Sequence, residues 1–394
     1  MAVGIAVGVL APDVGKELQP ITNIFLRLIK SIVAPLLFGT LVYGIAGHGD
    51  IKAMGRIGVK AIVYFEIVTT MALIVGLGAV NLAQPGEGLT VERSTTAAAA
   101  PAVGPPSFAA ILEHTFPASI IDAMAKGEVL QIVVFSFMFG AACAAVGLKA
   151  KPMVVFAESL SEVMFKYTGY VMYFAPFGVG AAMAVTVSTK GLKVLVGLAK
   201  LVVTTYVAQF VFVVFVFGTV IFLAKIPLRR FIGAAKEPFL IAFSTASSEA
   251  ALPLALENME RFGVPKHIVA FVLPTGYSFN LDGTTLYLSL ASVFVSQAAG
   301  VHMTIGQQIV MLLTLMLTSK GVAGVPRASY VVLLGTLATF GLPVEGAAMI
   351  LGVDAVLDMV RTSVNVLGNC LATAVVARWE GVKLEEHEET AVAA

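Results

Sequence analysis

The sequence predicts an all-α polytopic membrane protein with eight transmembrane helices and two re-entrant hairpins. Hydrophobic residues make up 58% of the 394 residues and charged residues only 12%, whereas soluble domains average about 45–50% and about 25%. Apolar runs of membrane length recur along the chain, and a helix needs about 20 apolar residues to cross a bilayer. Two further apolar stretches are interrupted near their middles, which indicates segments that enter the membrane and return.

Eight apolar runs mark the predicted spans. The first is too short to cross a bilayer alone. A cleaved signal peptide is the alternative for this first run, but no basic segment precedes it. In chain order the runs lie near residues 1–11, 21–46, 57–83, 128–147, 153–186, 194–224, 265–299 and 346–377.

Basic residues near the span ends predict the orientation, because cytoplasmic loops carry an excess of Lys and Arg. The loops after the second, fourth and sixth spans are basic, whereas Arg93 is the only Lys or Arg in the segment 85–107. We therefore expect 85–107 to be an external loop. We expect both termini, including the acidic tail 381–394, to be cytoplasmic. The lysines that disagree with this count are Lys190, Lys193 and Lys200.

The two interrupted stretches, 226–262 and 303–343, are predicted to be re-entrant hairpins. Each has small residues around a central proline, and each is followed by a span with polar residues. Irregular backbone at membrane depth must line a cavity or be buried in protein. The repeated order predicts two inverted copies of one unit around a central site, although two short core helices with chance glycines remain the alternative. The distance from proline to polar residue is nearly equal in both copies, from Pro253 to Asn280 and from Pro326 to Asp354.

The last span carries the most informative pattern, because three charged and three neutral polar side chains interrupt it. At about 100° per residue, they fall within an arc of about 100°. A charged side chain at the centre of a span costs about 2.5–3.5 kcal/mol on insertion scales, so such a stripe must face protein or a water-filled cavity. The pattern therefore predicts a binding path. Its residues are Asp354, Asp358, Arg361, Thr362, Asn365 and Asn369.

A second polar interruption, at residues 280–283, lies within the predicted span 265–299. Asn280 and Asp282 beside a helix-breaking glycine predict a local unwinding, whose carbonyls and carboxylate can bind a small cation. The alternative is that Asp282 caps a second half-helix at Gly283.

Four motifs resemble one known family. In chain order they are SSEAALP at 247–253, PTGYSFNLDGTTLY at 274–287, SKGVAGVP at 319–326 and LDMVRTSVNVLGN at 357–369. Together they resemble the dicarboxylate/amino acid:cation symporters, the glutamate transporter family, and among these the bacterial proton/glutamate symporters most.

This resemblance implies a homotrimer in the lipid bilayer, located in the inner (plasma) membrane of a bacterial cell. Each chain, 1–394, is expected to form a single membrane transporter domain. The resemblance further implies a scaffold and a transport core that moves as an elevator. The scaffold is expected at about residues 1–56 and 108–190, and the core at about residues 57–84 and 191–380.

The resemblance also implies a substrate site, and the chemistry of two of its residues agrees with an acidic amino acid. Arg361 offers a planar fork for a side-chain carboxylate, and Asp358 offers an acceptor to an α-ammonium. An internal ion pair between the two is an alternative reading. Family members that take C4-dicarboxylates lack an aspartate at the position of Asp358. The implied residues are Ser247, Ser248, Thr284, Val325, Asp358, Arg361, Thr362 and Asn365.

Cation coupling is where the chain departs from sodium-driven family members. Asn369 stands where those members carry aspartate, and Phe65 and Val68 replace a tyrosine and a threonine of another sodium site. These departures favour protons, carried by a carboxyl such as Glu66 or Glu249, because burial disfavours the charged form. The implied cation-binding or proton-carrying residues are Glu66, Thr69, Glu249, Gly276, Ser278, Asn280, Asp282, Ser319, Asn365 and Asn369, with a possible sodium ion at Asn280, Asp282 and Asn365.

We therefore expect a secondary active symporter that imports glutamate or aspartate with protons by alternating access. It would be no enzyme and would use no further cofactor. Sodium-coupled transport of these amino acids, or of C4-dicarboxylates, is the alternative. The net charge of +1 gives no basic field for nucleic acid. An intramembrane aspartyl protease would need two aspartates in YD and GxGD motifs at membrane depth, and neither Asp282 nor Asp358 stands in such a motif. A passive channel would not need two hairpin gates.

Overall fold

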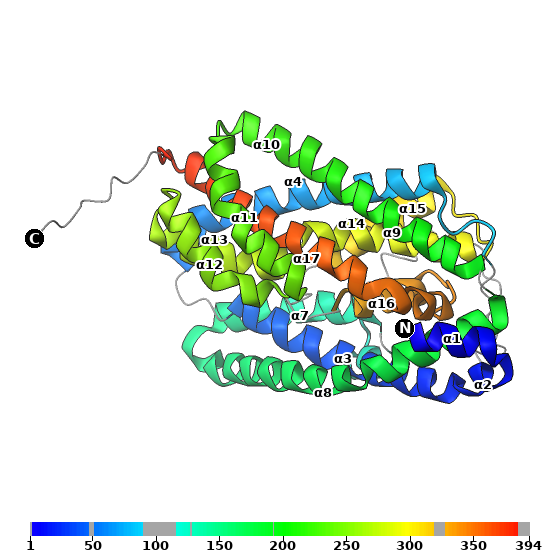
Figure 1. Cartoon of the computed structure of the whole chain (residues 1–394). Helices are drawn as coiled ribbons and strands as arrows, with labels where there is room; N and C mark the ends of the chain where they lie inside the picture. The colour runs from blue at the N-terminus through cyan, green and yellow to red at the C-terminus, as the bar shows by residue number, and fades with distance from the viewer. Residues whose placement is uncertain are drawn as a thin grey trace, which may run out of the picture.

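The computed structural model describes residues 2–46, 51–89, 116–126, 128–191, 193–318 and 328–384. Within these ranges every regular element is a helix, as predicted. The long helices run roughly side by side (Figure 1). Three of the described helical segments are long and apolar enough to cross a membrane, at Arg56–Ala83, Val134–Val171 and Val194–Leu223.

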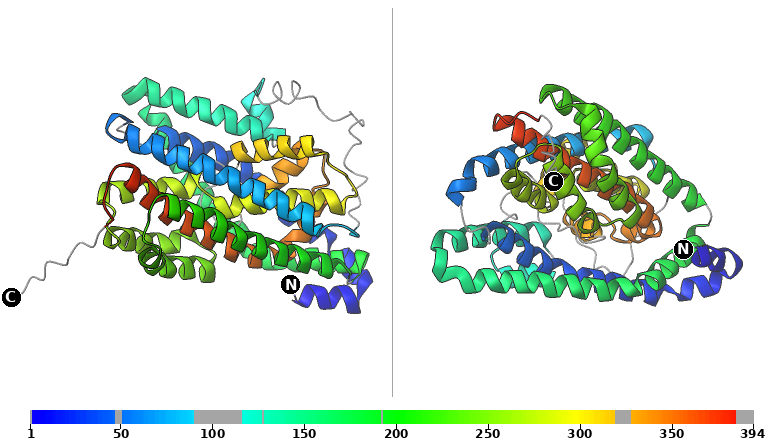
Figure 2. Two further views of the ribbon diagram at one scale, coloured as in Figure 1. Left: turned by 90° about the horizontal axis from the view of Figure 1, so that it is seen from above. Right: turned by 60° about the vertical axis from the view of Figure 1, so that its left-hand side comes forward.

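A first layer is built around α8, which packs along α3. The short helices α1 and α2 lie against the C-terminal part of α8, where a Cβ at Gly4 would meet the backbone of Gly180. This layer forms the lower part of Figure 1 and of the right-hand view in Figure 2. It comprises α1 (Ala2–Leu10), α2 (Pro12–Glu17), α3 (Gln19–Ala46), α6 (Ile120–Lys126), α7 (Val129–Val146), the short 3-10 turn Gly147–Ala150 and α8 (Lys151–Lys190).

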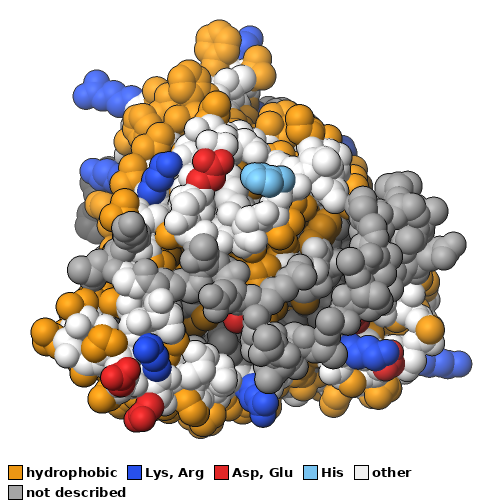
Figure 3. Space-filling view, turned by 90° about the vertical axis from the view of Figure 1, so that its right-hand side faces the viewer, with side chains coloured by type: hydrophobic (Ala, Val, Ile, Leu, Met, Phe, Trp, Pro, Cys, Tyr) orange, Lys and Arg blue, Asp and Glu red, His pale blue; other side chains and the backbone are white. Residues whose placement is uncertain are grey.

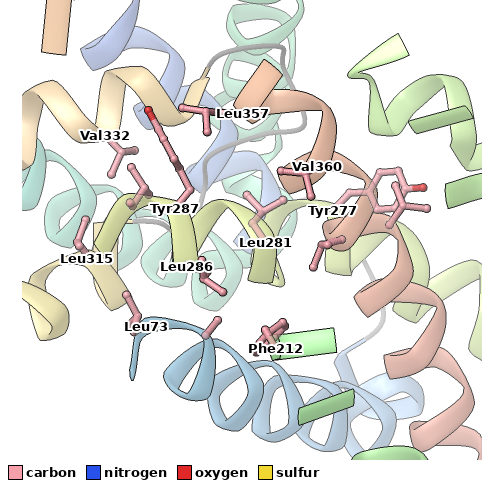
Figure 4. Close-up of a cluster of buried hydrophobic side chains, with 14 of the residues drawn as sticks. Leu73, Phe212, Tyr277, Leu281, Leu286, Tyr287, Leu315, Val332, Leu357 and Val360 are labelled. Atoms are coloured by element: carbon pink, nitrogen blue, oxygen red, sulfur yellow. The ribbon is translucent and has the colours of Figure 1, made fainter. Parts of the chain in front are cut away.

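The remaining helices surround α14, in which every residue except Gln297 is buried. Figure 4 shows how side chains of α14, such as Leu286 and Tyr287, meet those of neighbouring helices. This second body comprises α4 (Ile51–Ala83), α9 (Lys193–Val211), a π-helical turn (Phe212–Phe217), α10 (Gly218–Leu223), α11 (Leu228–Thr245), α12 (Ser248–Arg261), α13 (Lys266–Phe279), α14 (Asp282–Ala298), α15 (Ile305–Thr318), α16 (Ala328–Thr339) and α17 (Glu345–Trp379).

Large hydrophobic side chains remain exposed on the outer helices. Tyr173 on α8 and Phe222 on α10 are each 80% exposed. Seen from one end of the molecule, hydrophobic side chains line much of the rim (Figure 3). An extended apolar exterior of this kind is suited to lipid, because exposing so much apolar surface to water is unfavourable.

Each interrupted stretch contains two helices, and their re-entry into the membrane stays a prediction. In the first, α11 ends at Thr245 and Ala246 adopts a left-handed conformation with φ 49°. Ser247 then caps α12, its side chain accepting a hydrogen bond from the Ala250 N–H. In the second, α15 and α16 are the two arms, and the residues between them, 319–327, lie outside the described ranges.

The predicted span 265–299 is divided at Asn280 and Leu281 into α13 and α14, which confirms the predicted unwinding. The capping alternative does not hold in position, because Leu281 and not Asp282 occupies the N-cap position of α14. Asp282 lies inside the first turn of α14, where the helix dipole stabilises a negative charge.

The end of α17 is held to the start of α4 by ion pairs. Glu380, just beyond α17, accepts hydrogen bonds from Lys60 Nζ at 2.6 Å and from Arg56 Nη2 at 2.6 Å. Lys60 also donates to the Trp379 carbonyl at 2.5 Å. The Glu380 side chain is only 9% exposed. Lys60, and then Arg56, lower the pKa of this carboxyl.

We expect Glu380→Gln to lower the thermal unfolding temperature in detergent at neutral pH. Because the pKa of Glu380 is lowered in the folded protein, its stabilisation is present above the ordinary carboxyl pKa of about 4.3. It disappears as the pH falls through the lower folded pKa. The difference between wild type and variant should therefore shrink in acid. Glu257→Gln is the control, because its pair with Arg261 is exposed and should contribute little at any pH. A difference that does not change with pH would contradict this assignment.

Candidate functional site

The centre of α17 holds a buried cluster of three charges. Arg361 has 0% exposed side-chain surface. Its Nη1 lies 2.8 Å from Asp354 Oδ1 and its Nε lies 2.7 Å from Asp358 Oδ1. The guanidinium also stacks over the Tyr287 ring at 4.4 Å from the centroid, a favourable contact for a cation. The internal ion pair between Asp358 and Arg361 is thus present.

One donor of this cluster is left over. Among the described residues, Arg361 Nη2 is buried and has no hydrogen-bond partner. A buried unsatisfied donor costs about 1–3 kcal/mol, and more when it is charged. The group therefore fits an incoming acceptor such as a carboxylate, which guanidinium groups bind in a planar geometry.

The whole polar stripe of α17 faces the protein interior, as predicted. All six residues are at most 7% exposed. Thr362 Oγ1 donates to Asp358 Oδ1 at 3.2 Å, so the carboxylate that could meet an ammonium is oriented by a neighbour one turn away. The six buried residues are Asp354, Asp358, Arg361, Thr362, Asn365 and Asn369.

The start of α14 is tied directly to α17. Asn365 Oδ1 accepts from the Thr284 N–H at 3.1 Å, and its Nδ2 donates to Thr284 Oγ1 at 2.9 Å. Gly283 lies against the backbone of Arg361, where a Cβ would overlap the carbonyl oxygen. Two residues that the resemblance placed in the substrate site, Thr284 and Asn365, are therefore direct partners.

A second polar cluster lies at the helix break. Asn280 Nδ2 donates both to Asp282 Oδ2 and to Asn369 Oδ1, each at 3.1 Å. Gly276 and Gly368 make room for it, because a Cβ at Gly276 would overlap Asn369 Oδ1 and one at Gly368 would overlap Asp282 Oδ2. The structure thus brings together four of the predicted cation residues, Gly276, Asn280, Asp282 and Asn369.

These side chains offer one carboxylate and two amides to a cation. Asn280 Oδ1 is buried and has no partner among the described residues, which leaves an oxygen free to bind. The set consists of oxygen ligands, which suit small hard cations better than transition metals. Within the described ranges there is no group of three or more His, Cys, Asp or Glu side chains that could hold a metal ion.

The remaining predicted site residues lie on α4, on α12 and α13, or outside the described residues. Ser248 is 3% exposed beside the cap residue Ser247. On α4, Thr69 is buried and Glu66 is half-buried. Two of the predicted side chains, Glu249 on α12 and Ser278 on α13, are not described, and Ser319 and Val325 lie outside the described residues. The buried cysteines are Cys143 and Cys370.

Sequence reasoning missed three contributors. Asp354 was recognised as part of the stripe but not as the partner of Arg361, and Tyr287 was not recognised as its stacking ring. Gln209 on α9 was also missed, although its Nε2 donates to the Gly283 carbonyl at 2.7 Å. Its signal was available, because Gln209 is the only amide side chain in the apolar run 194–224, and polar groups at membrane depth are functional candidates.

Apolar helices of membrane length, paired hairpin helices, a broken helix and a buried charged stripe define the class as a secondary membrane transporter. The comparison with known families agrees with this class. The chain belongs to the Sodium:dicarboxylate symporter family, whose family model matches residues 1–379. It is accordingly a membrane symporter and not an enzyme.

Its relatives are similar over nearly the whole length. The chain is 47% identical over 395 residues to a "Proton/sodium-glutamate symport protein" of Geobacillus stearothermophilus, covering 98% of this chain and 94% of the relative. It is 47% identical over 372 residues to a "Proton/glutamate-aspartate symporter" of Escherichia coli (strain K12), covering 92% and 85%. It is 43% identical over 383 residues to a "C4-dicarboxylate transport protein" of Bacillus subtilis (strain 168), covering 96% and 91%.

The contact of Gly283 with the Arg361 backbone predicts that Gly283→Ala is destabilising, although alanine normally favours helices. We expect a loss of about 1–3 kcal/mol, the usual cost of overpacking, seen as a lower unfolding temperature in detergent. Gly78→Ala on α4 is the control, because nothing lies within 4 Å of its Cβ position. Equal unfolding temperatures for the two variants would contradict the close packing of α14 on α17.

Proposed function

We propose that this protein is a secondary active symporter that imports an acidic amino acid, glutamate or aspartate, together with protons. The observation that carries the proposal is Arg361 Nη2, which has no hydrogen-bond partner among the described residues and lies in the same buried cluster as the Asp358 carboxylate. Together they present a carboxylate-binding donor and an ammonium-binding acceptor within one turn of α17.

An acidic amino acid matches this pair in charge. Its distal carboxylate would bind Nη2 of Arg361, and its α-ammonium would bind Asp358. With both aspartates ionised, the cluster of Asp354, Asp358 and Arg361 carries a formal charge of −1, since one arginine faces two carboxylates. An ammonium offsets this charge, whereas a plain dicarboxylate brings only further negative charge.

Transport of C4-dicarboxylates is the second candidate. It is supported by a relative with that printed name at 43% identity. Both the glutamate and the C4-dicarboxylate relatives cover most of the chain, so identity alone does not separate the two substrates. Asp358 favours the amino acid, because its carboxylate can accept hydrogen bonds from an α-ammonium, which a C4-dicarboxylate lacks.

We also propose the arrangement that the resemblance implied. The chain would form a homotrimer in the plasma membrane of a bacterium, with both termini cytoplasmic. The layer around α8 would belong to the fixed scaffold, and the helices around α14 to the moving core. In the right-hand view of Figure 2 the two sets of helices form two layers, which touch where α8 packs against α17, and this layering supports that division.

Wild type should bind aspartate or glutamate in preference to succinate. Asp358→Asn should weaken aspartate binding by about 2–5 kcal/mol, the usual cost of removing one partner of a buried charge pair. Succinate has no ammonium, so its binding by the same variant should not fall. Isothermal titration on detergent-purified protein measures both ligands. Equal affinity of wild type for succinate and aspartate would favour the second candidate.

Protons are proposed as the coupling ion because the cluster at the helix break contains one carboxylate, Asp282, and two neutral amides, Asn280 and Asn369. On α4, Phe65 and Val68 present apolar side chains to the buried core. Each change removes a ligand or a charge that would favour a sodium ion.

An inward proton gradient should therefore drive uptake of radiolabelled aspartate into proteoliposomes in sodium-free buffer. Glu66→Gln should flatten the dependence of uptake on pH, because an amide cannot carry the proton. Asn369→Asp is the matched variant, since it restores a carboxylate to the cluster and should increase stimulation by sodium. Uptake that requires external sodium and ignores the proton gradient would overturn proton coupling.

A further inference from the structure

Gln209 is a buried polar side chain in an apolar helix. It belongs neither to the predicted substrate residues nor to the predicted cation residues. It lies on α9 with 1% exposure. A buried amide is costly unless it is hydrogen-bonded, and Gln209 makes one strong bond, from Nε2 to the Gly283 carbonyl at 2.7 Å. The orientation of the amide is fixed by this contact, because the opposite orientation would place two acceptor oxygens together.

The Gly283 carbonyl, which accepts this bond, lies where α14 is in close contact with α17. Gly283 follows the break at Asn280 and Leu281 and touches the Arg361 backbone. The next residue, Thr284, exchanges two hydrogen bonds with Asn365. Gln209 therefore links a third helix, α9, by a hydrogen bond to the start of α14, which α17 already contacts.

The turn that follows α9 packs close to the same helix break. Directly after α9, the chain forms a π-helical turn at Phe212–Phe217, and such turns occur frequently at functional sites. Phe212 and Phe217 are fully buried and pack with ring centroids 4.9 Å apart. A Cβ at Gly368 would touch Phe217 as well as Asp282. Figure 4 shows Phe212 in the buried cluster with Leu281 and Leu286 of the α14 region.

We propose that Gln209 is a positioning residue for the substrate site. It does not touch the substrate. Its hydrogen bond holds the Gly283 carbonyl, and through it the start of α14, in the position from which Thr284 meets Asn365 and Gly283 meets Arg361. This inference rests on the proposed function only for the identity of the ligand.

Gln209→Glu tests the bond itself. A protonated glutamate can donate its O–H to the Gly283 carbonyl, whereas an ionised one has only acceptors and repels it. The variant should bind aspartate nearly as wild type does at acidic pH and at least about tenfold more weakly at alkaline pH, the size expected from one unmade buried hydrogen bond. Asp282 and Arg361, the charged groups adjoining Gly283, are unchanged in every variant. The ratio of variant to wild-type affinity at each pH therefore cancels their effects and those of a transported proton.

Two further variants separate positioning from general stability. Gln209→Leu should weaken binding by about tenfold at every pH. Thr205→Val is the matched control one turn earlier on α9, because Thr205 is equally buried and its hydroxyl donates only to the Leu201 carbonyl of its own helix. It should leave affinity unchanged. A Gln209→Glu to wild-type ratio that does not vary with pH, or an equal loss in Thr205→Val, would overturn the proposal.

Hydrogen exchange separates this inference from the proposed function. In ligand-free protein, Gln209→Leu should speed amide exchange in the peptide that contains Thr284, whose N–H is bonded to Asn365, while Thr205→Val should not. If wild type bound succinate and no acidic amino acid, the proposed substrate would fail and the affinity ratios would be measured with succinate. Unchanged exchange in Gln209→Leu would overturn the positioning role whatever the substrate.

Discussion

The buried guanidinium of Arg361 is the group on which the rest of the site depends. Moving a charge out of water costs several kcal/mol even after relaxation, and Arg361 has no exposed side-chain surface. Two carboxylates and the face of Tyr287 compensate for this cost. These partners come from α17 itself and from α14, so the charge can be buried only when the two helices are in contact. Glycine at position 283 permits that contact, which links the local sequence of the helix break to the electrostatics one helix away.

The same close approach explains why the helix is broken where it is. Asn280 and Leu281 leave the helical conformation, and the freed geometry lets Asn280 bond to Asp282 and Asn369 together. Gly276 and Gly368 leave the space for these polar groups. A continuous helix with larger residues would separate α13 and α14 from α17 by at least one side chain. The Tyr287 ring would then no longer cover the Arg361 guanidinium, and Asn280 would lose its hydrogen bond to Asn369. Buried polar groups without partners are costly.

Much of this arrangement could be predicted from the sequence, because it depends on local pattern. The periodic stripe of α17, the two hairpins and the break at Asn280 follow from helical spacing, prolines and glycines. The partners across helices could not be predicted in this way. Asp354 lies seven residues from Arg361, and whether it or Asp358 holds the guanidinium depends on side-chain geometry. Tyr287 and Gln209 are far away in sequence, and their contacts with Arg361 and Gly283 arise only when α14 packs between α9 and α17.

Charge balance in the site gives a physical reason for coupling to a cation. With its acidic groups ionised, the cluster at Arg361 carries −1 and Asp282 adds a further −1 at the helix break. The proposed acidic amino acid would bring a further net charge of −1 close to these carboxylates. Such charges repel one another strongly in a low-dielectric interior. Cations that enter with the substrate, whether bound protons or metal ions, remove this repulsion. Asp282 lies one residue from Gly283, which touches Arg361, so a cation there would favour the substrate through both charge and the position of α14.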